Sequence, residues 1–202
     1  DEPSDMTLRL SVPAPKTIVL VGLMGVGKTS IGRLLAKRLD LEFIDADQEI
    51  ELAAQCSIEQ IFERHGEAEF RDGEQRVIAR LLTGPAHVLA TGGGAFMRQK
   101  TRDAIRGRGI SVWLRADLDL LLRRVSRRKN RPLLRNKNPR QALEKLIEER
   151  YPVYAEADIV VDSGDQPPGT IVDTVIESLE TFLGSGVGSG LGSGAGSGGA
   201  KN

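Results

Sequence analysis

The sequence predicts an α/β fold in which helices cover both faces of a parallel sheet. Short apolar segments alternate along the chain with longer segments in which apolar residues recur every three or four positions. The first kind of segment is typical of a strand buried on both faces, and the second is typical of an amphipathic helix. Their alternation favours βαβ units, in which consecutive strands run parallel.

Five short segments have the character of buried strands, and eight longer segments have helical periodicity. The expected strands are 17–21, 42–46, 87–91, 110–114 and 159–161. The expected helices are 28–39, 48–54, 57–64, 68–82, 99–106, 117–127, 140–149 and 170–183. In such sheets ligands bind beyond the carboxyl ends of the strands. The functional site is therefore expected after Val21, Ile44 and Ala90, with Leu114 as a further candidate position.

Length and composition indicate one folded domain with a flexible segment at each end. A chain of 202 residues is long enough for one core and short for two. Residues 1–15 hold three prolines and show no clear periodicity, which predicts a flexible leader. Residues 184–199 repeat glycine and serine, which predicts a disordered tail over 184–202. The folded domain is expected over 16–183.

The overall composition argues against several classes of partner and site. The chain has 28 Lys and Arg residues against 28 Asp and Glu residues, and only 4% aromatic residues, so neither a nucleic acid nor a membrane is expected as a partner. One cysteine, Cys56, excludes an intramolecular disulfide and an all-cysteine metal site. No signal peptide or membrane-spanning segment is recognisable. The expectation is a monomeric, cytoplasmic protein.

One segment departs from this balance of charge. Between Arg123 and Arg140 there are nine basic residues and no acidic residue. Such a segment attracts phosphate groups, whether on a nucleotide or on a nucleic acid. A solvated helix face would explain the same pattern, so the charge alone does not decide between these alternatives.

Residues 22–29, GLMGVGKT, match the phosphate-binding pattern GxxxxGK[ST] and stand between an expected strand and an expected helix. Glycines allow backbone N–H groups to surround phosphate oxygens, and the helix adds the positive end of its dipole. Lys28 would place a charge on the β- and γ-phosphates, and the Thr29 hydroxyl is a suitable ligand for Mg²⁺. The motif indicates binding of a nucleoside triphosphate, but it does not separate a switch GTPase from a small-molecule kinase.

Two carboxylates, Asp45 and Asp47, lie at the end of the second expected strand. Alternation along a strand would point both of them toward the phosphate site. Beside Mg-ATP, one acid can hold a metal-bound water while the other orients or deprotonates an acceptor hydroxyl. The alternative is that Asp47 is the N-cap of a helix that begins at Gln48.

A glycine triplet and several arginines complete the set of candidates. Residues 92–94 are all glycine and would let the backbone approach a small ligand, or would form only a tight turn. Arg71 stands among acidic residues, so an ion pair is the alternative to a substrate contact. Residues 131–134, RPLL, lie in the basic segment and suit a mobile lid over phosphates. Arg150 stands near the end of an expected helix.

Six motifs occur in an order that resembles one enzyme family. GLMGVGKT, DAD, EFR, GGG, RPLL and ERYPVY together are similar to the shikimate kinases, which are small P-loop kinases of the nucleoside-monophosphate-kinase type. The resemblance extends over roughly residues 16–183. It implies a three-layer fold with a five-stranded parallel sheet and a lid. It also implies transfer of the γ-phosphoryl group of ATP, with Mg²⁺, to the 3-hydroxyl group of shikimate, in aromatic amino-acid biosynthesis.

The resemblance implies roles for residues on the ATP side. The phosphates would be bound by Gly22, Gly25, Val26, Gly27, Lys28, Thr29 and Ser30. Mg²⁺ would be held by Thr29 and, through water, by Asp45. Arg131 would contact the γ-phosphate and act with Lys28 in catalysis, and adenine would lie between Arg124 and Pro168.

On the acceptor side, the resemblance implies that Asp47 orients or deprotonates the attacking hydroxyl group. Arg71 and Arg150 would bind the shikimate carboxylate, assisted by the backbone of Gly93 and Gly94. This agrees with the chemistry of the side chains, because forked guanidinium groups are well suited to a planar carboxylate.

Two other functions remain as alternatives. One is a related kinase for another hydroxy acid such as gluconate, although that does not explain why EFR and GGG occur together. The other is a nucleotide-dependent switch that binds RNA through the basic segment. A GTPase switch would usually carry an NKxD-type motif, and residues 136–138, NKN, lack the final acid.

Overall fold

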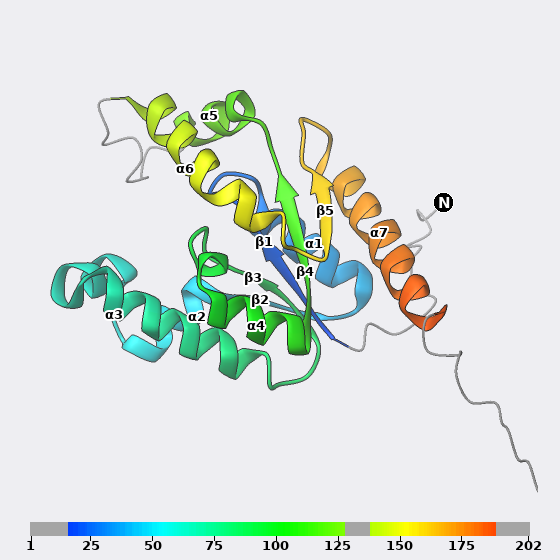
Figure 1. Cartoon of the computed structure of the whole chain (residues 1–202), viewed down its shortest axis with the longest axis horizontal. Helices are drawn as coiled ribbons and strands as arrows, with labels where there is room; N and C mark the ends of the chain where they lie inside the picture. The colour runs from blue at the N-terminus through cyan, green and yellow to red at the C-terminus, as the bar shows by residue number, and fades with distance from the viewer. Residues whose placement is uncertain (1–15, 128–137, 189–202) are drawn as a thin grey trace, which may run out of the picture.

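The computed structural model describes residues 16–127 and 138–188, and it places five strands in one sheet (Figure 1). The strands are β1 (Thr17–Val21), β2 (Glu42–Asp45), β3 (His87–Ala90), β4 (Gly109–Arg115) and β5 (Ile159–Asp162). Their order in the sheet is β2-β3-β1-β4-β5, and every neighbouring pair is parallel. The predicted parallel sheet is confirmed.

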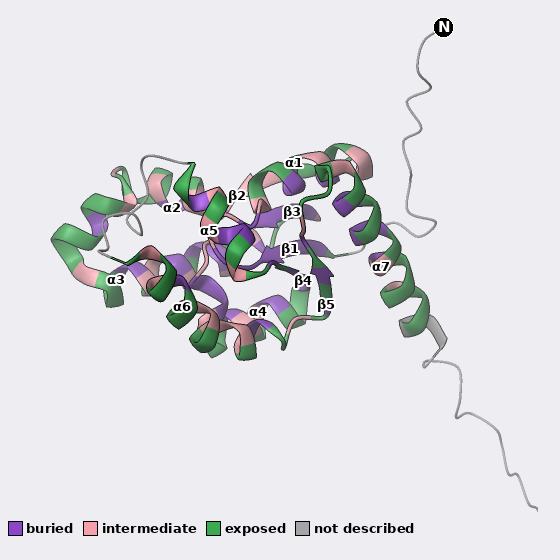
Figure 2. Cartoon of the chain, turned by 90° about the horizontal axis from the view of Figure 1, so that it is seen from above, coloured by how far each residue is buried: buried purple, intermediate pink, exposed green. Residues whose placement is uncertain are grey.

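Helices lie on both faces of this sheet (Figure 2). They are α1 (Lys28–Leu39), α2 (Ala46–Ala54), α3 (Ile58–Leu81), α4 (Gln99–Arg108), α5 (Leu118–Ser126), α6 (Pro139–Tyr154) and α7 (Pro168–Gly188), with a short 3₁₀ helix, η1 (Ala95–Met97). α1 and α7 pack against each other on one face, and α4 and α6 lie on the other. The described residues therefore form the expected three-layer α/β fold.

The central strand explains why the functional loops meet at one edge of the sheet. All five residues of β1 are buried, because β1 has a strand on either side and helices over both faces. The carboxyl ends of β1, β3 and β2 are neighbours, since these strands are adjacent and parallel. The segments that follow these strands are thus brought together at one edge.

α2 and α3 form an extension with a small apolar core of its own. That core consists of Ile50, Ile61, Phe70 and Val77. α3 begins with a capping box, in which Ser57 and Gln60 each bond the other's backbone N–H. Gly66 interrupts the helical backbone with φ 79° and ψ 176°. This kink falls in the gap between the two helices expected over 57–64 and 68–82.

The structure corrects the expected local geometry of the two aspartates. Asp45 is the N-cap of α2, and its carboxylate accepts hydrogen bonds from the N–H groups of Asp47 (2.9 Å) and Gln48 (3.4 Å). Asp47 lies in the first turn of α2 rather than at its N-cap or on a strand. The alternation argument therefore does not apply to it, because the strand has ended before Asp47.

Two helices continue further than expected. α6 was expected to end at residue 149, but it runs to Tyr154 and includes Pro152. α7 continues to Gly188, so residues 184–188 are helical although the sequence placed them in the tail. The Ser185 hydroxyl donates to the Thr181 carbonyl within this extension (2.8 Å).

Among the residues that the structure describes, no helix combines the length and the hydropathy needed to cross a lipid bilayer. The predicted leader over 1–15, the lid residues 131–134 and the tail after residue 188 lie outside the described residues.

Candidate active site

The loop between β1 and α1 has the backbone of a phosphate-binding loop. Gly22, Gly25 and Gly27 have φ values of 143°, 86° and 103°, a region that L side chains rarely adopt. At Gly22, an added Cβ atom would also lie 2.7 Å from the Leu114 carbonyl oxygen. Glycine at the first position is therefore required both by the turn and by the close approach of β4.

α1 begins at Lys28, directly after this loop. Gly27 is its N-cap and supplies no side-chain acceptor for the first N–H groups of the helix. Those groups and the helix dipole favour an anion at this end. The Lys28 ammonium group donates to the carbonyl oxygens of Gly22 (2.6 Å) and Leu23 (3.0 Å). The loop thus holds a positive charge at the place where phosphates would bind.

A cavity of about 340 Å³ lies beside the same loop. It is lined by Gly25, Gly27, Thr29, Ser30, Ile31, Arg124, Arg127 and Pro168. The Arg124 guanidinium is fixed by hydrogen bonds to the carbonyl oxygens of Val26 (3.0 Å) and Gly164 (2.7 Å). The structure therefore brings part of the loop predicted for phosphate and both residues predicted for adenine to one cavity.

Two oxygen donors suit a magnesium ion of the kind that nucleotides carry. Thr29 offers a hydroxyl oxygen beside the cavity, and Asp45 offers a carboxylate at the end of β2. No group of three or more His, Cys, Asp or Glu residues that could hold a metal ion occurs within the described ranges. Mg²⁺ bound to a nucleotide takes most of its ligands from phosphates and water, so one or two protein oxygens are sufficient.

The glycine triplet, residues 92–94, contacts three residues that the sequence assigned to the acceptor. A Cβ atom on the first glycine would lie 3.0 Å from Oδ1 of Asp47. On the second it would lie 3.0 Å from Nη1 of Arg150, and on the third 2.5 Å from Cζ of Arg71. One side chain larger than hydrogen would displace a charged group at each position. The triplet is therefore more than a tight turn.

The triplet also lies against the phosphate-binding loop. An added Cβ atom at Gly93 would be 3.7 Å from both the Gly22 carbonyl oxygen and the Met24 backbone nitrogen. The aspartate, the two arginines and the phosphate loop therefore surround one region at the carboxyl edge of the sheet, although they come from α2, α3, α6 and the β1–α1 loop.

Burial changes the acidity of Asp47. The pKa of the Asp47 carboxyl is raised, first by burial and then by the negative charge of Asp45. The positive charge of Lys28 opposes this shift. A carboxylate with a raised pKa is a stronger proton acceptor than an ordinary aspartate, provided that it is ionised at the working pH.

Arg71 also makes the ion pair that the sequence suggested as its alternative role. Its Nη1 donates to Oε1 of Glu74 (2.8 Å), and its Nε lies 3.8 Å from Glu67. Glu74 is 2% exposed, and burial raises the pKa of its carboxyl while Arg71 lowers it. This ion pair holds the guanidinium against Gly94. The ion pair and the substrate contact are therefore compatible.

Two residues of this region were not assigned a role from the sequence. Glu74 could have been found from its spacing, because residues three positions apart in a helix are neighbours. Tyr154 is fully buried, its hydroxyl donates to the Gly93 carbonyl oxygen, and burial raises its pKa to about 12. No local pattern indicated Tyr154, since its partner lies 61 positions away. Arg131 lies outside the described residues.

Comparison with known proteins finds relatives that match most of the chain. A family model described as shikimate kinase matches residues 24–180. A shikimate kinase of Paramagnetospirillum magneticum is 55% identical over 182 residues, which cover 90% of this chain and 93% of the relative. A shikimate kinase of Caulobacter vibrioides is 58% identical over 164 residues, or 81% of this chain and 82% of the relative. The chain belongs to the shikimate kinase family.

Membership of the shikimate kinase family confirms the predicted fold, the kinase activity and the place in aromatic amino-acid biosynthesis. Among solved structures, a shikimate kinase from Acinetobacter baumannii in complex with shikimate is 40% identical, with a TM-score of 0.78. That match covers 86% of this chain and 96% of the other. A gluconokinase from Sinorhizobium meliloti is 19% identical with a TM-score of 0.63, over 90% of this chain and 99% of the other. It shares the fold and gives no support to the gluconate alternative.

Proposed function

We propose that this protein binds ATP beside α1 and shikimate at the glycine triplet, and that it transfers the γ-phosphoryl group to the 3-hydroxyl group. The observation that carries the proposal is the convergence of Asp47, Arg71 and Arg150 on residues 92–94, against the phosphate-binding loop. In this proposal an acidic, hydroxylated acceptor would lie next to the triphosphate. The A. baumannii enzyme, with shikimate bound, supports the choice of acceptor.

The carboxylate of shikimate would be bound by Arg71 and Arg150. Each guanidinium lies at a different glycine of the triplet, so a small planar group can approach both without steric hindrance from a side chain. Backbone N–H groups of Gly93 and Gly94 would add neutral donors. Two forked guanidinium groups favour a carboxylate over an uncharged sugar alcohol.

Asp47 would orient the attacking hydroxyl group and accept its proton. The hydroxyl oxygen then forms a bond to the γ-phosphorus, while the bond between that phosphorus and the bridging oxygen breaks and ADP leaves. Because the transition state is loose, most of the rate acceleration comes from alignment and neutralisation of charge. Lys28 supplies positive charge for the phosphates, and Arg131 would do so from the lid segment.

Mg²⁺ would be held by the Thr29 hydroxyl and, through water, by Asp45. When bound, the ion neutralises phosphate charge and fixes the orientation of the triphosphate. Asp45 is itself oriented by accepting the N–H groups at the start of α2. The same carboxylate thus connects the second strand, the helix that carries Asp47 and the proposed ion.

The catalytic unit would be a monomer in the cytoplasm. Every proposed site residue belongs to one chain, so no second copy is needed to complete the site. The single cysteine suits a reducing compartment, and ATP is a cytoplasmic substrate. Neither a nucleic acid nor a membrane is part of the proposal.

An assay of ADP release tests the proposed function. The rate is measured with Mg-ATP alone, with added shikimate and with added gluconate at equal concentration. Release that depends on shikimate, at least about 10²-fold above the rate without an acceptor, is the expected result. Equal release without an acceptor, or a faster reaction with gluconate, would overturn the assignment of the acceptor.

A further inference from the structure

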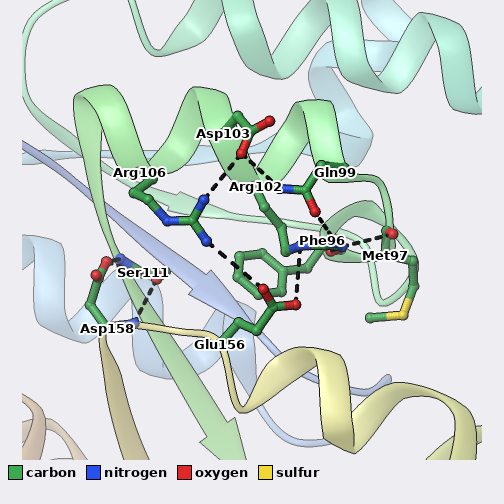
Figure 3. Close-up of polar contacts among 9 residues, drawn as sticks. All are labelled: Phe96, Met97, Gln99, Arg102, Asp103, Arg106, Ser111, Glu156 and Asp158. Atoms are coloured by element: carbon green, nitrogen blue, oxygen red, sulfur yellow. Dashed lines mark hydrogen bonds and ion pairs between the residues drawn. The ribbon is translucent and has the colours of Figure 1, made fainter.

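Arg102, on α4, connects the segment after the glycine triplet with the end of α6 (Figure 3). Its Nη1 donates to the carbonyl oxygens of Phe96 and Met97, at 2.8 Å each, and its Nη2 donates to Oε1 of Gln99 (2.6 Å). The Arg102 side chain is only 10% exposed. This guanidinium holds the two backbone carbonyl groups strongly, since both bonds are partly buried and their loss would leave polar groups without a partner.

The two carbonyl groups belong to η1, which is hydrogen-bonded to the glycine triplet. The N–H of Ala95 donates to the Gly92 carbonyl and the N–H of Met97 donates to the Gly94 carbonyl, both at 3.2 Å. The carbonyl groups at the end of a short helix have no partner within the helix. Arg102 supplies their partner, so it holds the whole turn from residue 92 to 97.

The other contact of Arg102 reaches the end of the helix that carries Arg150. Nε of Arg102 lies 3.4 Å from Oε2 of Glu156, two residues after the end of α6. This contact is an ion pair without the alignment of a hydrogen bond. The Tyr154 hydroxyl forms a second connection between α6 and the triplet at Gly93. Two contacts therefore fix the position of Arg150 relative to the triplet: one at Gly93, through Tyr154, and one at η1, through Arg102 and Glu156.

We propose that Arg102 is a positioning residue for the acceptor. It holds the turn 92–97 against α6, and so it sets the distance between the two arginines, Arg71 and Arg150, that would bind the carboxylate. The inference rests on the proposed function, in which these arginines bind the carboxylate. Arg102 contacts neither shikimate nor ATP in this proposal and acts through the backbone of the triplet. Loss of Arg102 should therefore weaken binding of shikimate and leave binding of ATP unchanged.

Arg106 provides a matched control on the same helix. Its Nη2 lies 3.9 Å from Oε1 of the same Glu156 and its Nη1 donates to Asp103 (3.1 Å) (Figure 3). Among the residues that the structure describes, the η1 carbonyl groups accept a side-chain hydrogen bond from Arg102 and not from Arg106. Its side chain is 55% exposed. Replacing Arg106 thus removes the same charge and one contact with Glu156, while the turn keeps its hydrogen bonds.

The test compares Arg102→Met, Arg102→Lys and Arg106→Met by steady-state kinetics with both substrates. Arg102→Met should raise KM for shikimate about tenfold and change KM for ATP less than about twofold, because a small displacement of positioning groups is costly. Arg102→Lys should fall between Arg102→Met and the unsubstituted protein, since one ammonium cannot reproduce the planar fork. Arg106→Met should change KM for either substrate by less than about twofold.

Three results would overturn the proposal: equal increases in both KM values, an unchanged KM for shikimate in Arg102→Met, or an equal effect of Arg106→Met. If Arg102→Met fails to fold, Glu156→Gln gives a second measurement, because it keeps the η1 hydrogen bonds and removes the ion pair. It should raise KM for shikimate about threefold, and no change would count against the connection to α6. Arg71→Lys tests the acceptor site separately from the role of Arg102. If Arg71→Lys leaves KM for shikimate unchanged, the proposed acceptor site is wrong, whatever the Arg102 variants show.

Discussion

The donor and acceptor halves of the site are built in different ways. On the donor side, one continuous segment, residues 22–29, supplies the loop, the lysine and the start of α1. On the acceptor side, three charged side chains from three different helices meet at a glycine triplet. Backbone geometry determines the first half, and the packing of distant elements determines the second.

This difference predicts how substitutions act in each half. A donor residue contributes charge or backbone shape directly, so its loss should change ATP binding or turnover without reference to other helices. An acceptor residue depends on the elements that hold it, as Arg71 depends on Glu74 and Arg150 on the contacts of α6 with Gly93. Affinity for shikimate should therefore respond to substitutions of residues that do not contact shikimate, whereas affinity for ATP should respond only to residues on the donor side.

The largest effect is expected from Lys28→Ala. The substitution removes the positive charge of Lys28 from the phosphate loop and should lower kcat about 10³-fold or more, since preorganised charge is a major part of catalysis. Lys37→Ala is the control, because Lys37 lies on the exposed face of the same helix. Initial rates of ADP formation measure both. Turnover of Lys28→Ala within tenfold of the unsubstituted protein would contradict the role of Lys28.

Asp47→Asn should have the next largest effect on kcat, and its effects on activity and on stability should differ. An amide cannot accept the proton, so kcat should fall about 10²- to 10³-fold while KM for ATP changes little. Glu49→Gln, in the same turn of α2, serves as the control and should keep its activity. An equal loss in kcat and in ATP affinity would argue that Asp47 acts on the nucleotide instead.

The same substitution should stabilise the folded protein above the range in which Asp47 titrates. Since the folded state raises the pKa of Asp47, it binds this proton more tightly than the unfolded state does. Stability is therefore lost as pH rises through the raised pKa, and the asparagine avoids that loss. Thermal unfolding should show that Asp47→Asn and the unsubstituted protein have the same Tm at about pH 3, below the ordinary aspartate pKa, and that the variant has the higher Tm at pH 7. A lower Tm at pH 7 would show that ionised Asp47 is stabilised by its partners.

Arg71→Lys should give a smaller effect, confined to the acceptor. Lysine keeps a positive charge for the buried Glu74 but loses the two parallel N–H donors, so KM for shikimate should rise about tenfold. KM for ATP should remain unchanged. Arg76→Lys is the matched control, because Arg76 is an exposed arginine of the same helix. A selective increase in KM for ATP would reverse the assignment of the two halves.

The difference between the halves also explains what the sequence could predict. The loop 22–29 was predicted in full because its motif is local and its flanking strand and helix have clear periodicity. Asp47 was placed near the phosphates for a wrong reason, since the second strand ends at Asp45 and the helix begins earlier than expected. Burial and distant contacts, rather than any pattern around Asp47, determine its environment.

The acceptor residues show more clearly what could not be predicted from the sequence. Arg71 and Arg150 were assigned by resemblance, because nothing in their local sequence requires them to face one another. Tyr154 and Arg102 depend on partners in other elements and on a helix, α6, that continues beyond its expected end. Contacts of this kind arise only when the chain has packed, so single-sequence reasoning has no signal for them.

The smallest effect, and the most direct comparison within the donor half, is expected from Arg124→Met. Arg124 connects α5 to the phosphate loop through Val26 and to Gly164, and methionine keeps the apolar surface that would cover adenine. KM for ATP should therefore rise only about threefold, with KM for shikimate unchanged. Arg123→Met is the neighbouring control, because Arg123 is half-exposed and pairs with Asp165 at the surface. If Arg124→Met instead raised KM for shikimate, coupling through Val26 would extend to the acceptor, and the two halves would not be independent.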